Sequence, residues 1–113
     1  MMKYFVHNNE RESTAYHEFV KGKWDGKSFW NRDSICLHDD VLVTHVGFYE
    51  ALKKMIPGYD PYAIAVEVSR DSWTKVGEAI SSDDLGSLEL YKEANEWVKE
   101  PLEKYGCFTI LGL

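Results

Sequence analysis

The sequence predicts one α+β domain, or an open α/β domain, in which a small sheet of about four strands packs with about four helices. Three observations predict this class. The 113 residues are a usual length for a single domain. Apolar runs typical of strands are interleaved with longer stretches of helical periodicity. No repeat, linker or low-complexity segment divides the chain, so we expect residues 1–113 to pack around one core.

Four short stretches are predicted as strands. The clearest is Tyr62 to Ser69, where large apolar residues alternate with small or polar ones. The face with small residues has room for a helix at close range. Cys107 to Leu111 is apolar at nearly every position, which predicts an interior strand beside residues 62–69. Shorter strands are expected at Lys3–His7 and Ile35–His38.

Helical periodicity and end signals predict the remaining elements. Asn9 and Glu12 have the spacing of a capping box at the start of the first helix. The stretch from Thr14 to Val20 also alternates as a strand, which is the alternative for that segment. The expected helices span about Glu10–Lys21, Asp40–Ile56, Ser72–Ile80 and Asp84–Lys104.

Three further segments have two interpretations each. β-branched residues between Val41 and Val46 disfavour a helix start, so a hairpin over Ile35–Val46 is the alternative there. Asp25-Gly26 is a turn signal, either of a small aromatic hairpin or of a turn in an irregular loop. The apolar stripe of the last helix continues past Pro101, which either bends that helix or begins a second one.

The charge of the chain limits its partners. The formal net charge is −6, whereas nucleic-acid backbones and anionic membrane surfaces attract clustered Lys and Arg. We therefore expect neither nucleic acid nor membrane as a partner. An acidic chain is compatible with a basic protein partner, although acidity also serves solubility.

The cysteines and the termini indicate a compartment. Cys36 and Cys107 are the two cysteines, and their separation is not that of a disulfide scaffold. The apolar run near the N-terminus is too short for a signal peptide, and no window has the length of a membrane-spanning helix. We expect a cytoplasmic protein with reduced thiols.

Four residues are the candidates for chemistry, and none belongs to a catalytic motif. Cys36 and His38 would share one side of a strand, and Glu67 is a lone acid within the clearest strand. His38 and His45 would lie roughly 10 Å apart along a helix, too far to bind one metal ion together. Only the hairpin alternative would bring these two histidines together. We expect no metal site and no cofactor, and the absence of catalytic motifs favours a non-enzymatic protein.

Four aromatic residues are the candidates for binding. Trp24, Phe29, Trp30 and Tyr59 flank turn signals. Aromatic residues in loops often anchor interfaces, and they also fold back to cover a core. Both interpretations apply here.

Three functions are compatible with these residues. The first is a small acidic protein that acts by binding other proteins, as an inhibitor, an immunity-type protein or a regulatory module. In size and charge the chain is similar to immunity proteins and toxin inhibitors, which neutralise basic enzymes, but no motif carries this likeness. The second is a small ligand-binding or enzymatic domain with a polar pocket near Cys36–His45 and Glu67. The third is a homo-oligomeric structural subunit whose terminal strand pairs across a twofold axis.

Overall fold

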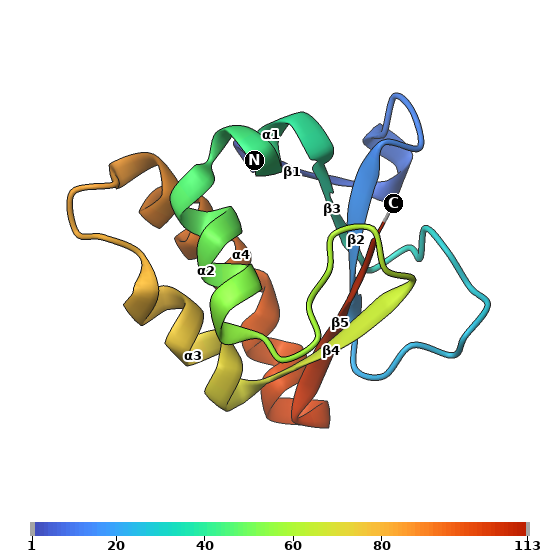
Figure 1. Ribbon diagram of the computed structural model, residues 1–113. Coiled ribbons are helices and arrows are strands. Elements are labelled where there is room, and N and C mark those ends of the chain that lie inside the picture. The colour runs from blue at the N-terminus through green and yellow to red at the C-terminus, as the bar shows by residue number, and fades with distance from the viewer. Residues whose placement is uncertain (1, 113) are drawn as a thin grey trace.

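The computed structural model describes residues 2–112 and places a five-stranded antiparallel sheet against a layer of helices (Figure 1). The order of the strands across the sheet is β1-β3-β2-β5-β4. Their bounds are β1 Phe5–His7, β2 Tyr16–Lys21, β3 Ile35–His38, β4 Ala65–Ser69 and β5 Cys107–Leu111. The predicted α+β class is confirmed, with five strands in the sheet.

The helices cover one face of the sheet, while the connection between β2 and β3 lies on the other side (Figure 1). Within the described part of the chain, none of them is long and apolar enough to cross a bilayer. They are α1 Asp39–Thr44, α2 Val46–Met55, α3 Arg70–Ala79 and α4 Leu85–Tyr105, and a short 3-10 turn, η1, spans Asn8–Glu10.

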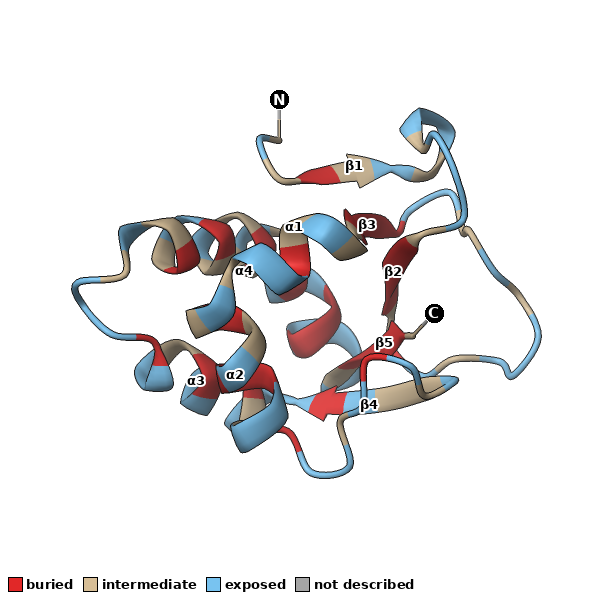
Figure 2. Cartoon of the chain, turned by 45° about the horizontal axis from the view of Figure 1, so that its top comes forward, coloured by how far each residue is buried: buried red, intermediate tan, exposed pale blue. Residues whose placement is uncertain are grey.

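The core between helices and sheet is built on aromatic side chains. Phe108 of β5 stacks on Phe19 of β2 with ring centroids 5.6 Å apart, and it meets Trp73 of α3 edge-on at 5.3 Å. Such pairs add to the stabilisation that comes from burying their area. Figure 2 shows that β2 and β5 are buried along nearly their whole length, as expected for strands covered on both faces.

The helix predicted for Glu10–Lys21 is wrong, and the strand alternative for Thr14–Val20 is close to the observed β2. All of Tyr16 to Val20 is buried. Because both faces of this strand are covered, its sequence does not alternate between apolar and polar residues. The spacing of its apolar residues therefore also fits one face of a helix. The predicted capping box at Asn9 and Glu12 is also wrong, because the box lies at His7 and Glu10 of η1.

The prediction of a helix over Asp40–Ile56 is confirmed apart from one break, and the hairpin alternative is not observed. His45 leaves the helical region with φ −95° and ψ 71°, and it separates α1 from α2. The break falls among the β-branched residues that disfavour a helix. At the start of α1, the Nδ1 atom of His38 accepts the N–H of Asp40.

The strand predicted for Tyr62–Ser69 is shorter than expected and faces differently. Tyr62 and Ile64 precede β4 and are exposed. Val68 packs toward the helices, because the apolar face of a strand needs cover. The small-residue face, which carries Glu67, therefore lies on the side away from the helices. We had expected a helix to pack against this face, and that prediction is wrong.

The C-terminal segment is close to its prediction. The helix α4 runs through Pro101 without a break and stops at Gly106, whose φ of 77° suits glycine. Strand β5 is an interior strand between β2 and β4, as predicted. Both of its edges are thus occupied, so the terminal strand is not free to pair across a twofold axis.

Candidate functional site under the aromatic loop

The side of the sheet away from the helices is covered by a loop of residues 22–34, which we call the aromatic loop because it carries Trp24, Phe29 and Trp30. No strand forms within this loop, so the turn at Asp25-Gly26 belongs to irregular structure. Its first part is ordered by Asp25, which accepts the N–H groups of Lys27 and Ser28 and the hydroxyl of Ser28. These bonds lower the pKa of the exposed Asp25 carboxyl to about 2, with the Ser28 side chain as the largest cause.

A buried carboxylate fastens the second part of the loop to the sheet. Glu18 of β2 is only 1% exposed. Its Oε1 accepts the N–H of Trp30 at 2.6 Å, and its Oε2 accepts the backbone N–H and the side-chain amide of Asn31 at 2.8 and 3.0 Å. Trp30 has a φ of 59°, which is strained for a residue with a side chain. The bonds to Glu18 compensate this strain, because they satisfy two successive backbone donors.

The ring of Trp30 is also held from outside the loop. The guanidinium of Arg11 lies 3.5 Å from the centroid of this ring, in a cation–π contact. Arg11 is itself fixed, because its Nε donates to Asn8 Oδ1 and its Nη1 donates to the carbonyl of Ser13. Earlier in the loop, the indole of Trp24 donates to the carbonyl of Ser28.

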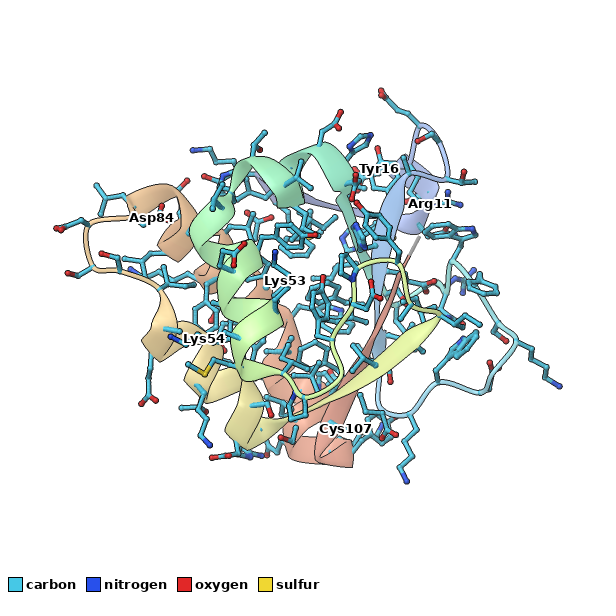
Figure 3. The ribbon with its side chains drawn as sticks, in the orientation of Figure 1. Arg11, Tyr16, Lys53, Lys54, Asp84 and Cys107 are labelled. Carbon is cyan, nitrogen blue, oxygen red and sulfur yellow. The ribbon has the colours of Figure 1, made fainter. Side chains whose placement is uncertain are left out.

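A cavity of about 410 Å³ opens between the loop and the sheet, and we call it the aromatic cavity. Phe29 is 52% exposed, and the cavity therefore meets solvent along a phenyl ring. In Figure 3, Tyr16 and Arg11 are seen on this side of the molecule, above the loop. The cavity is lined by Thr14, Ala15, Tyr16, Glu18, Phe29, Trp30, Leu111 and Gly112.

Among the described residues, the aromatic cavity combines apolar walls with the carboxylate of Glu18. Tyr16, Phe29 and Trp30 provide ring surfaces, and Glu18 provides the charge. A site of this composition suits a ligand group that has apolar faces and a donor at its end. A smaller cavity of about 220 Å³ lies farther along the loop, among Lys23, Asp25 and Asp33, and it is lined mainly by polar groups.

The four candidates for chemistry do not line the aromatic cavity. Cys36 is fully buried in β3 opposite Glu18, and burial, followed by the charge of Glu18, raises the pKa of its thiol to about 12. The ring of His38 packs edge-on against Tyr16 at 4.9 Å. Cys36 is therefore a protonated thiol, which is a poor nucleophile.

The remaining two candidates lie elsewhere. His45 is on the helix side, where its Nδ1 contacts the carbonyl of Val41 and its ring packs against Tyr4. Glu67 accepts the thiol of Cys107 at 3.7 Å, and the pKa of that thiol is raised, mostly by burial and then by Glu67. Residues 2–112 contain no group of three or more His, Cys, Asp or Glu that could hold a metal ion.

The aromatic candidates divide into two groups. Trp24, Phe29 and Trp30 all belong to the aromatic loop, and Trp24 and Phe29 contact each other at 5.3 Å between centroids. Tyr59 lies apart, in the connection between α2 and β4, with its hydroxyl buried. Glu18 was not predicted as a site residue. Its one indication in the sequence is an acid between His17 and Phe19. In the helix predicted there, Glu18 would lie on the polar face, where an acid is expected.

A second polar arrangement lies at the edge of the core. His17 of β2 is 1% exposed, and its Nε2 is 2.8 Å from Asp39 Oδ1. Its Nδ1 is buried and has no hydrogen-bond partner among the described residues. Burial lowers the pKa of His17 below its usual 6.5, and the bond to Asp39 opposes this only in part.

The lowered pKa of His17 predicts an acid-sensitive fold. Below pH 6.5 His17 is protonated in the unfolded chain but remains neutral in the folded protein. The free energy of unfolding therefore falls as the pH drops from 6.5 toward the pKa of folded His17. We expect a loss of up to about 2 kcal/mol between pH 7 and pH 5. His17→Gln keeps a donor for Asp39 and does not titrate, so its unfolding free energy, measured in urea, should change less over this interval. Equal losses in the two proteins would contradict this assignment.

The sequence matched no family model, no curated protein and no solved structure.

Proposed function

We propose that the protein is a binding module that docks a basic protein partner on the face formed by the aromatic loop. The aromatic cavity is the observation that carries this proposal, because it places exposed apolar surface and a carboxylate at the same position. Interfaces of this kind are enriched in aromatic anchors that fill or line pockets. The net charge of −6 favours a partner of opposite sign.

The surface continues beyond the cavity. Gly112, which lines the cavity, donates its N–H to the carbonyls of Ala63 and Ile64. The side chain of Ile64 is 70% exposed, and that of the nearby Tyr62 is exposed as well. The segment before β4 thus adds apolar area next to the cavity, as a docking surface requires.

A basic enzyme neutralised by the protein, or a basic target that it regulates, fits the same features. The proposal includes a cytoplasmic location, where Cys36 and Cys107 stay reduced.

Affinity capture with matched variants tests the proposal. The baits are the wild type, Phe29→Ser and Val46→Ser, incubated with lysate of the source cells at low salt. Val46 is an exposed apolar residue (61%, against 52% for Phe29) at the start of α2, on the helix side of the sheet, and serves as the control. We expect one basic protein on the wild type and on Val46→Ser, its loss on Phe29→Ser, and weaker capture at high salt. The same proteins on all three baits would refute the proposal.

A further inference from the structure

We infer that the aromatic cavity receives an arginine side chain of the partner. This inference rests on the proposed function and names the group that the cavity recognises. It follows from three features of the described residues: a buried carboxylate that makes no ion pair, ring surfaces around it, and an acceptor position that no donor occupies.

Among the described residues, the carboxylate of Glu18 makes no ion pair. None of the salt bridges among residues 2–112 includes it. Its three donors are two backbone N–H groups and one neutral amide. A buried charge without a counter-charge is costly, so a cation that enters the cavity gains more from Glu18 than it would from an exposed acid.

An acceptor position of Glu18 is also unused. A carboxylate offers about four acceptor positions, two on each oxygen. The Oε2 atom uses both with the two donors of Asn31, whereas Oε1 accepts only the N–H of Trp30. Oε1 can therefore accept a further donor, and Glu18 is one of the residues that line the cavity.

The cation that lies over Trp30 is engaged elsewhere. The guanidinium of Arg11 donates to Asn8 and Ser13 and lies over Trp30, and Arg11 does not line the cavity. This contact nevertheless shows that the ring of Trp30 can stack with a guanidinium group. None of the described residues that line the cavity is basic, so the cation that we infer belongs to another molecule.

Arginine suits the walls better than lysine does. Its guanidinium is planar, weakly hydrated and able to stack on rings, while the lysine ammonium is compact and strongly hydrated. Tyr16, Phe29 and Trp30 offer such rings beside Glu18. The volume of about 410 Å³ is within the usual range for pockets that bind small ligands, and it leaves room for the apolar stem of the side chain.

Peptide titrations followed by NMR test this inference. The probes are acetyl-Gly-Arg-Gly-amide and the same peptide with citrulline, a neutral analogue of nearly identical shape. We expect saturable shifts of the Trp30, Asn31 and Gly112 amides with the arginine peptide, and roughly tenfold weaker binding with citrulline. The lysine peptide should fall between them. Equal binding of the arginine and citrulline peptides, or no shifts at these amides, would overturn the inference.

Two variants locate the binding site. Phe29→Ala removes an exposed wall and should weaken the arginine peptide several-fold without affecting the fold. Glu18→Gln should abolish the preference for arginine over citrulline; if this variant does not fold, Phe29→Ala alone decides. Unchanged affinity in Phe29→Ala would overturn the inference.

The inference and the proposed function can fail separately. If capture of the partner depends on Phe29 but the protein does not respond to the arginine peptide, the docking surface is supported and the arginine site is refuted. A response to the peptide with capture that does not depend on Phe29 retains the arginine site and refutes the docking surface.

Discussion

Replacing Glu93 of α4 with alanine is expected to lower the free energy of unfolding by about 3 kcal/mol. Its carboxylate accepts three successive backbone N–H groups, those of Lys3, Tyr4 and Phe5, at 2.8, 2.9 and 2.8 Å. These donors lead into β1, which lies at the edge of the sheet and pairs with β3. Hydrogen bonds to a charged acceptor are the stronger kind, and three converge on this residue.

The decrease in the free energy of unfolding is limited by the cost of detaching β1 from the sheet. Once the donors are unpaired, β1 can detach, and detachment exposes the buried Phe5, which costs on the order of 2–3 kcal/mol. The bonds of Lys3 and Tyr4 to Glu89 remain and hold the segment in part. We therefore expect faster hydrogen exchange at the amides of β1 and β3 than in the rest of the sheet.

Urea unfolding of three variants checks this prediction. Glu93→Gln keeps one good acceptor oxygen and should fall between the wild type and Glu93→Ala. Glu96→Ala is the control, because Glu96 lies one turn farther along α4 and forms an exposed ion pair with Lys99. A Glu93→Ala protein as stable as Glu96→Ala would show that this carboxylate does not hold β1.

The elements that sequence reasoning located well are those with clear ends. Strand β5 has the predicted bounds because a run that is apolar at nearly every position follows Gly106, whose positive φ stops α4. Strand β3 has the predicted bounds because the apolar run Ile35–Leu37 is followed by two aspartates that begin α1. In both cases a local signal and the need for burial agree.

Strand β2 was missed because its determinants are distant in sequence. His17 and Glu18 are polar, yet both are buried, since Asp39 and the backbone of Trp30 and Asn31 satisfy them. These partners lie 12 to 22 residues away. Periodicity within a short window contains no information about them, so the helical period fitted equally well.

The candidate site was predicted in part for the same reason. The aromatic residues of the loop could be recognised from composition, because tryptophan and phenylalanine beside turn signals are uncommon in solvated loops. Glu18 could not be recognised, because its role depends on the pairing of β2 with β3 and on the path of the loop. The sequence predicted Glu67 as the candidate acid instead, although Glu67 is exposed and Glu18 is buried.

Replacing Glu18 with alanine is expected to release the aromatic loop and to destabilise the protein by about 3 kcal/mol. The substitution leaves the N–H groups of Trp30 and Asn31 and the amide of Asn31 without an acceptor. It also removes the bonds that compensate the φ of 59° at Trp30. Removal of a buried charge acts in the opposite direction, but the three unpaired donors outweigh it, since the loop cannot hydrate them without opening.

Opening of the loop provides a direct measurement. Lys23, Lys27 and Arg32 are exposed residues of the loop, and trypsin cleaves after each of them once the backbone becomes mobile. We expect rapid cleavage within residues 22–34 in Glu18→Ala and slow cleavage in the wild type. Glu67→Ala is the matched control, because Glu67 is a glutamate on the same face of the sheet and its hydrogen bond joins it to Cys107, which is not part of the loop. If the loop of Glu18→Ala resists trypsin as the control does, then the aromatic cavity keeps its roof without this carboxylate, and the recognition of a cation by Glu18 must be tested apart from loop order.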